Sequence, residues 1–186
     1  LGARVTAHVF GEDALPDLLE ARIDCIEHGS GLSPDLMDVM AARDVAVVPT
    51  LVNIDNFPTF AAQGEAKFPA YAKHMRALHA RRYETIGLAR EAGVPVYAGT
   101  DAGGTLPHGL LAREVVELTR AGLPAEEALA AASWAAREWL GLPARLSDGA
   151  PADLVVLSDD PRVDPTTLAD PVRVILGRSP VYRPHS

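Results

Sequence analysis

Cysteine, basic charge and long apolar runs are all scarce in this 186-residue sequence. Cys25 is the single cysteine, which excludes an internal disulfide framework and a cysteine-rich zinc site and fits a reducing compartment such as the cytoplasm. The 17 basic residues are outnumbered by 25 acidic ones, and the net charge of -8 disfavours nucleic acid or an anionic membrane as a partner. No apolar run approaches the roughly 20 residues that a membrane-spanning helix needs.

An initiator methionine is also absent, and residues 1–4 (LGAR) lead directly into a strand-like segment. We therefore expect the chain to come from within a longer polypeptide, and its first residues say nothing about a signal peptide. What is present is a hydrophobic content of 48%, which is enough for a globular core.

Short apolar runs alternate with helical patterns over the first 140 residues. Strands are predicted at 4–8, 23–28, 46–51 and 94–100, and helices at 12–21, 34–43, 69–92, 111–121 and 124–140. The strands are almost continuously apolar, which is typical of parallel strands covered on both faces in an α/β protein. A complete (β/α)8 barrel takes about 250 residues, so four such units correspond to half of a barrel.

The pattern changes after Gly141. Short strands are predicted at 152–157, 172–176 and 181–183, separated by aspartate, proline and glycine. We expect a small β element here that packs on another part of the protein or lies at an edge. The chain is therefore predicted to divide into residues 1–144 and residues 145–186.

Three of the four predicted strands finish on a side chain that can bind a metal ion: His8, His28 and Asp101. The carboxyl ends of parallel strands meet at one face of a barrel, so these side chains should converge. Gly99 would share the interior face with Asp101 and leave room beneath it. Two neutral imidazoles and a carboxylate suit Zn²⁺, and also Mn²⁺ or Fe²⁺. A carboxylate beside an activated water can take its proton, which makes Asp101 the candidate catalytic residue.

Simpler explanations exist for each candidate residue. A single histidine is usually an ordinary surface or core residue, and an aspartate after a strand often caps the next helix. The shared placement at successive strand ends is what favours a site. His108, on the same loop as Asp101, is a candidate for substrate binding, with a solvated loop histidine as the alternative. Thr50 ends the third predicted strand and could line the pocket, or could simply be a good β former.

Several stretches together resemble the second half of the amidohydrolase superfamily, in its imidazolonepropionase-like and prolidase-like branch. They are AHVFG at 7–11, IEHG at 26–29, VPTL at 48–51, AGTDAG at 98–103, AGLPAEEALAAAS at 121–133 and DGAPADLVVLSDDP at 148–161. The resemblance implies that residues 1–144 supply strands 5–8 of a TIM-like (β/α)8 barrel. It implies that residues 145–186 supply C-terminal strands of a small, composite β-sandwich domain.

The resemblance also implies a binuclear metal hydrolase that cuts a C–N bond in an amide, cyclic amide or dipeptide. His8 and His28 would bind one metal, and Asp101 would bind the other and carry the proton. The family's His-x-His pair and bridging lysine have no counterpart in this sequence. We therefore expect the N-terminal half of the barrel, or another chain, to complete the site, with a homo-oligomer of half barrels as an alternative. A non-catalytic fragment or scaffold subunit with at most a weak metal site is the competing hypothesis.

Overall fold

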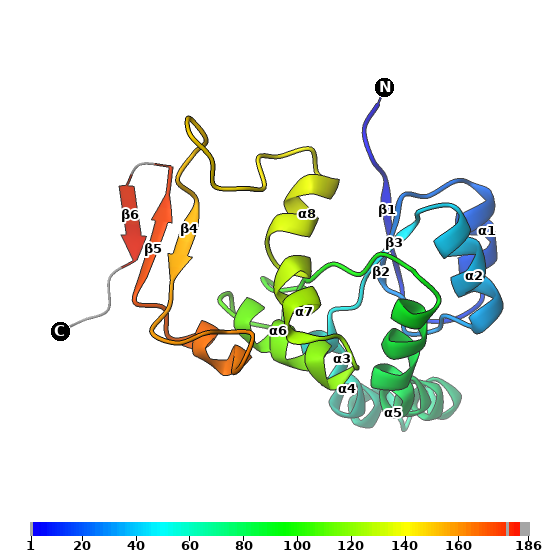
Figure 1. The fold of residues 1–186 in the computed structure, drawn as a ribbon. Helices are drawn as coiled ribbons and strands as arrows, with labels where there is room; N and C mark the ends of the chain where they lie inside the picture. The colour runs from blue at the N-terminus through cyan, green and yellow to red at the C-terminus, as the bar shows by residue number, and fades with distance from the viewer. Residues whose placement is uncertain (1, 178, 183–186) are drawn as a thin grey trace.

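The computed structural model describes residues 2–177 and 179–182, which form two three-stranded sheets joined by a helical region (Figure 1). The strands are β1 (Thr6–Val9), β2 (Cys25–His28), β3 (Ala46–Val48), β4 (Leu154–Val156), β5 (Arg173–Leu176) and β6 (Ser179–Tyr182). The helices are α1 (Leu15–Glu20), α2 (Pro34–Ala42), α3 (Leu51–Ile54), α4 (Phe57–Gly64), α5 (Pro69–Glu91), α6 (Leu111–Arg120), α7 (Ala125–Ala131), α8 (Trp134–Trp139) and the 3-10 helix η1 (Pro165–Ala169). Within the described residues, no helix has both the length and the apolarity that crossing a membrane requires.

The first sheet is parallel, with the strand order β1-β2-β3. Helices α1 and α2 lie beside it in Figure 1 and bury Leu15, Met37 and Met40 with Ile26 of β2. Each strand is followed by a helix, which is the arrangement expected for parallel strands, since a crossover must return the chain to the same end. The carboxyl ends of the three strands, and the loops that follow them, therefore lie at the same end of the sheet.

The fourth predicted strand, at 94–100, is not a regular strand. It joins the sheet through a single parallel bridge between Val47 and Val96. Pro95 has no N–H group to donate to a ladder, and the N–H of Ala98 donates to a carbonyl of α7 instead, at 3.0 Å. Pairing along this segment is therefore limited to a few residues, and the prediction of a strand of seven residues was wrong.

The helical region contains two more differences from the prediction. The helix predicted at 124–140 is divided into α7 and α8, because Ser133 leaves the helical conformation (φ -145°, ψ -101°). The stretch between β3 and α5 forms two further helices, α3 and α4. By contrast α5, the longest helix, matches the predicted range 69–92 within one residue.

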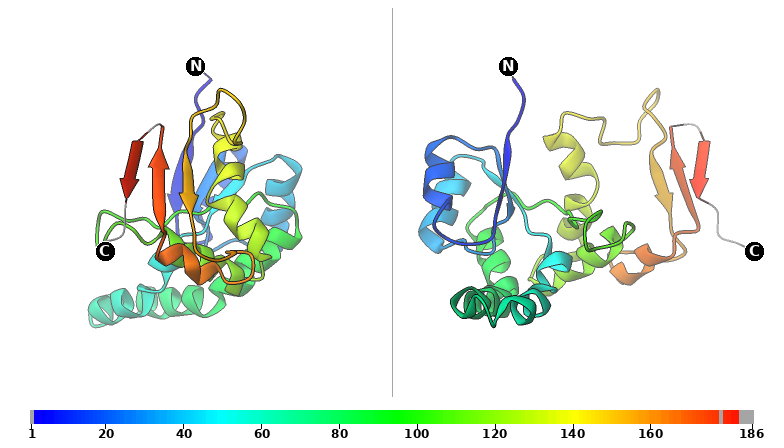
Figure 2. Two further views of the ribbon diagram at one scale, coloured as in Figure 1. Left: turned by 60° about the vertical axis from the view of Figure 1, so that its left-hand side comes forward. Right: turned by 180° about the vertical axis from the view of Figure 1, so that it is seen from behind.

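The second sheet is antiparallel, with the order β4-β5-β6, and lies apart from the first in Figure 1 and in the right-hand view of Figure 2. Asp153 ties it to the helical region, because its carboxylate accepts the N–H of Gly177 (2.7 Å) and binds Arg137 of α8 (2.9 Å). Of the strand predicted at 181–183, Arg183 lies outside the described residues. The division of the chain after residue 144 stays a prediction, as does closure of the first sheet into a barrel.

Gly31 lies where the loop after β2 passes over the loop after β1. A Cβ atom at this position would lie 2.5 Å from the carbonyl carbon of Gly11, and backbone cannot yield as a flexible side chain can. We expect Gly31→Ala to lower the free energy of unfolding by about 1–3 kcal/mol in urea denaturation, as overpacking does elsewhere. Gly64→Ala is the matched control, because a Cβ there meets nothing within 4 Å. Equal stability of the two variants would contradict the close approach.

Candidate functional site

His8 and His28 face each other at the carboxyl end of the parallel sheet. His8 lies on β1 and His28 ends β2. The Nε2 atom of His28 lies 2.7 Å from the Nδ1 atom of His8, and the ring centroids are 4.5 Å apart at an angle of 81°. Two residues that are 20 positions apart in the sequence thus present ring nitrogens to one point, because neighbouring parallel strands end at the same edge.

The environment of His28 keeps its imidazole neutral. The side chain is buried, with an exposed fraction of 3%. Burial is the main reason that its pKa falls from 6.5 to about 4, the neighbouring His8 lowers it further, and the charge of Asp101 partly offsets both. A neutral imidazole is the form that can bind a metal ion.

Thr50 holds the other side of the His28 ring. Its Oγ1 atom lies 2.6 Å from His28 Nδ1. Thr50 was expected at the end of a strand, but β3 ends at Val48, and Thr50 lies just before α3 in the left-handed conformation (φ 48°). Its exposed fraction is 3%, so its position favours orienting the histidine over contacting a substrate. Histidines that bind metal commonly have their second nitrogen fixed in this way.

Asp101 follows the segment at 94–100 and contacts α3. Its backbone is left-handed (φ 55°), and its Oδ2 atom accepts a hydrogen bond of 2.8 Å from Asn53 Nδ2 on α3. Burial and His8 lower the pKa of His28, and the charge of Asp101 acts in the opposite direction. Within the described residues, no group of three or more His, Cys, Asp or Glu side chains is arranged to hold one ion. The part of Asp101 in a metal site therefore stays a prediction.

Gly99 makes room for a neighbouring strand. A Cβ atom on Gly99 would lie 2.5 Å from Cγ1 of Val48. The absence of a side chain at Gly99 therefore lets β3 pack closely against this segment. The expectation that the glycine also leaves room beneath Asp101 stays a prediction.

The donor atoms at the histidine pair fit a divalent metal ion. Two nitrogens on one tetrahedral zinc ion, each at about 2.0–2.1 Å, lie roughly 3.3 Å apart. The observed separation of 2.7 Å between His8 Nδ1 and His28 Nε2 is shorter and is a hydrogen-bond distance, so the two nitrogens would move apart to share an ion. A tetrahedral ion held by this pair would need two further ligands from elsewhere.

Two residues at the site, Phe10 and Asn53, were not found from the sequence. The Phe10 ring packs against both imidazoles, with centroid distances of 4.4 Å to His8 and 4.5 Å to His28. Nothing in the sequence signals that contact. Asn53 is a buried amide between the buried residues Val52 and Ile54, and a buried polar group in an apolar run needs a partner. From the sequence, this need for a partner could have predicted that Asn53 makes a hydrogen bond such as the one to Asp101.

His108 lies exposed on the loop that follows Asp101. Its ring is close to Gly103, where a Cβ atom would lie 3.4 Å from His108 Cε1. The loop is closed by a hydrogen bond of 3.0 Å from the N–H of Gly103 to the carbonyl of Leu106. Contact between His108 and a substrate stays a prediction.

Comparison with known proteins gives consistent matches over nearly the whole chain. Residues 1–178 match the amidohydrolase family. An uncharacterized protein of Mycobacterium tuberculosis is 57% identical over 175 residues, which cover 94% of this chain and 47% of that protein. The crystal structure of a putative prolidase from Bifidobacterium longum superposes with a TM-score of 0.83 at 31% identity, over 98% of this chain and 48% of the other. The ochratoxinase of Aspergillus niger is 28% identical over 91% of this chain and 35% of its own length, and its crystal structure gives a TM-score of 0.80.

The chain spans less than half the length of each of these proteins. The mixed α/β fold matches that of the amidohydrolase structures.

Proposed function

Because the chain belongs to the amidohydrolase family, we propose that the full-length protein hydrolyses a carbon–nitrogen bond with the help of a divalent metal ion. The observation that carries the proposal is the pair of ring nitrogens, His8 Nδ1 and His28 Nε2, that face each other at 2.7 Å. The fold explains why these two nitrogens lie close together, since both residues come from the carboxyl ends of parallel strands.

His8 and His28 would hold the metal ion. Thr50 Oγ1 would accept the Nδ1 proton of His28, so that Nε2 keeps its lone pair for the ion. When bound, a divalent ion polarises a carbonyl group and lowers the pKa of water. Zn²⁺ suits these ligands, with Mn²⁺ or Fe²⁺ as alternatives.

Asp101 would bind a second metal ion and move the proton. Its carboxylate would take a proton from the attacking water and pass it to the leaving nitrogen. Asn53 donates to Oδ2 of this carboxylate at 2.8 Å, which fixes its orientation and leaves Oδ1 available for the proton. The exposed position of Asp101 lets a substrate reach it.

The substrate would be a small amide or a dipeptide. The names of two similar proteins, ochratoxinase and putative prolidase, support this class. Phe10 would supply an apolar wall beside the histidines, because its ring packs against both of them. His108 is a candidate for contact with the substrate from the loop after Asp101.

Further strands would complete both the sheet and the site. Within the described residues, β1 pairs only with β2, and the segment at 94–100 pairs only through Val96. Unpaired strand edges of this kind attract other strands. We propose that the N-terminal half of a barrel, or another chain, covers them, and a homo-oligomer is one form of this. The activity therefore belongs to the full-length protein.

Metal content and hydrolysis measured together test the proposal. We expect the full-length protein to contain about two equivalents of divalent metal, to lose amide hydrolysis after chelation and to regain it with Zn²⁺, Mn²⁺ or Fe²⁺. The assay would use a panel of Xaa-Pro dipeptides and N-acyl amino acids. His8→Ala should lose about one equivalent of metal and most of the activity.

His74→Ala is the matched control, because His74 is a half-exposed histidine that binds Glu12 on the protein surface. It should keep both metal and activity. Absence of metal and of hydrolysis in the wild-type protein would contradict the proposal and favour a non-catalytic scaffold.

A further inference from the structure

Glu114 is a carboxylate in the middle of an apolar core. It lies on α6, its exposed fraction is 0%, and its neighbours Val115 and Leu118 belong to a hydrophobic cluster. Burial raises its pKa to about 7, although the N–H groups of Val52 and Leu51 act in the opposite direction. An ionisable group at such a place costs folding free energy unless its oxygens are fully hydrogen-bonded.

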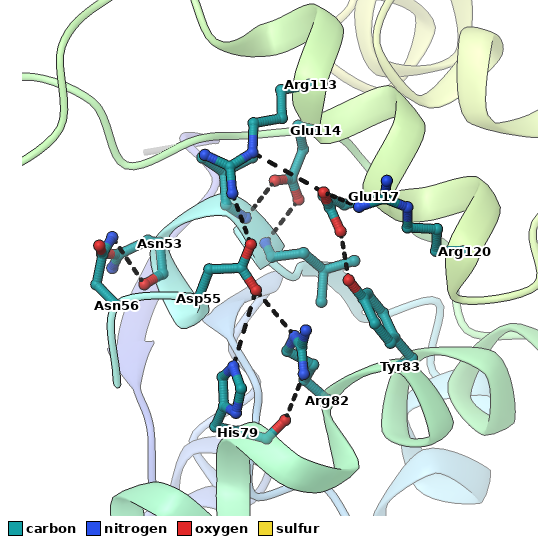
Figure 3. Close-up of polar contacts among 12 residues, drawn as sticks. Asn53, Asp55, Asn56, His79, Arg82, Tyr83, Arg113, Glu114, Glu117 and Arg120 are labelled. Carbon is teal, nitrogen blue, oxygen red and sulfur yellow. Dashed lines mark hydrogen bonds and ion pairs between the residues drawn. The ribbon is translucent and has the colours of Figure 1, made fainter. Parts of the chain in front are cut away.

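Both oxygens of Glu114 bind the start of α3. Oε1 accepts the N–H of Leu51 and Oε2 accepts the N–H of Val52, each at 2.8 Å. Figure 3 shows the carboxylate aimed at this turn, with Asp55 at the other end of α3 held by Arg82 and Arg113. The first N–H groups of a helix have no partner within the helix, so Glu114 supplies what the turn itself lacks.

The turn that Glu114 holds cannot be stable by itself. α3 has four residues, and nucleating a helix of one turn is unfavourable. The residue just before it, Thr50, is in the left-handed conformation, which a β-branched residue adopts only under constraint. An outside group must therefore fix this backbone.

The same turn carries two contacts to the proposed site. Thr50, just before α3, contacts His28 Nδ1 at 2.6 Å, and Asn53, within α3, contacts Asp101 at 2.8 Å. The residues that Glu114 binds lie between these two. Any shift of the turn would move both contacts together.

We propose that Glu114 is a positioning residue that holds Thr50 against His28 and Asn53 against Asp101 through the backbone of α3. The expected effect on catalysis rests on the proposed function. The effect of Glu114 on the position of Thr50 and Asn53 does not. Glu114 touches no reacting atom and acts through Thr50 and Asn53.

Glu117 provides the matched control on the same helix. Its exposed fraction is 2%, so it is also a buried glutamate. Its partners are the side chains of Tyr83, Arg120 and Arg113, and none of them is backbone at the start of α3 (Figure 3). If a loss of the His28 signal or of kcat came only from removing a buried carboxylate, Glu114→Gln and Glu117→Gln should therefore show the same loss.

The experiment compares Glu114→Gln, Glu117→Gln and the wild type in the full-length protein. Glutamine keeps the shape but offers one acceptor oxygen and sets an NH₂ group against a backbone N–H. The first readout is the ¹⁵N–¹H signal of the His28 Nδ1 proton in metal-free protein, assigned by its absence in His28→Asn. We expect this signal to be exchange-broadened or lost in Glu114→Gln and kept in Glu117→Gln.

The second readout is function. We expect Glu114→Gln to lower Zn²⁺ affinity and kcat by about 10–100-fold, the range typical of residues that orient metal ligands. KM should stay within about twofold, and Glu117→Gln should show little change in any of these. Urea denaturation should give similar midpoint shifts for the two variants. If Glu114→Gln does not fold, Glu114→Asp, which retracts the carboxylate by one methylene, takes its place.

Equal effects of the two variants on the His28 signal and on kcat would overturn the inference, and so would an unchanged His28 signal in Glu114→Gln. If the wild-type protein hydrolyses no amide, the proposed function fails. The His28 signal in metal-free protein still tests the positioning role in that case.

Discussion

Replacing Asp101 by asparagine should lower kcat for amide hydrolysis by about 10²–10⁴-fold, which is the usual contribution of a general acid–base group. Asparagine has the same shape, and its oxygen can still accept the hydrogen bond from Asn53 that Asp101 accepts now. It also tolerates the left-handed backbone found at this position (φ 55°). The substitution therefore removes the ability to carry a proton and leaves the local structure in place.

The measurement combines steady-state kinetics with metal analysis of the full-length protein. We expect the ion at His8 and His28 to remain largely bound in Asp101→Asn. Asp35→Asn serves as the control, because Asp35 is an exposed carboxylate on α2, and it should behave like the wild type. Wild-type turnover in Asp101→Asn would refute the proton-transfer role.

Acidification should destabilise the metal-free protein through His28. In the unfolded chain a histidine takes up its proton near pH 6.5, whereas burial and His8 hold the pKa of His28 in the folded protein at about 4. The unfolded state therefore binds more protons between these values, and stability falls as the pH decreases from 6.5 to 4. The loss attributable to this residue approaches about 3 kcal/mol at the acid end of the range.

Urea denaturation at pH 7.5 and pH 4.5, after chelation, measures this effect. His28→Asn removes the titrating ring and suits the left-handed backbone at position 28 (φ 70°), so its stability should depend less on pH than that of the wild type. His74→Asn removes an exposed histidine and should keep the wild-type dependence. The idea fails if His28→Asn and the wild type lose the same stability on acidification.

The features that the sequence predicted well are those set by local periodicity. The apolar face of a long helix repeats over many turns, so the prediction at 69–92 agrees with α5 at Pro69–Glu91. The helix predicted at 111–121 likewise agrees with α6 at Leu111–Arg120. The sequence also predicted that His8 and His28 lie close together, because adjacent parallel strands have their carboxyl ends at the same end of the sheet.

The features that were missed depend on contacts between distant segments. Thr50 was expected at the end of a strand but has a left-handed backbone, and the N–H of Leu51, which follows it, binds Glu114, 63 positions later. The segment at 94–100 does not form a regular strand beside β3. Pro95 has no N–H group, and the N–H of Ala98 donates to a carbonyl of α7. Neither result is visible in a window of neighbouring residues. Both concern the surroundings of the candidate ligands rather than the ligands themselves.

Five residues other than glycine have positive φ angles in the described part of the chain, and three of them, His28, Thr50 and Asp101, are at the candidate site. Relaxing any of these positions to glycine or asparagine would ease the backbone. A laboratory selection for heat resistance would therefore tend to accumulate stabilised variants that have lost residues of the candidate site at this end of the sheet. Screens that aim to keep the protein working at high temperature should score turnover and melting together from the first round.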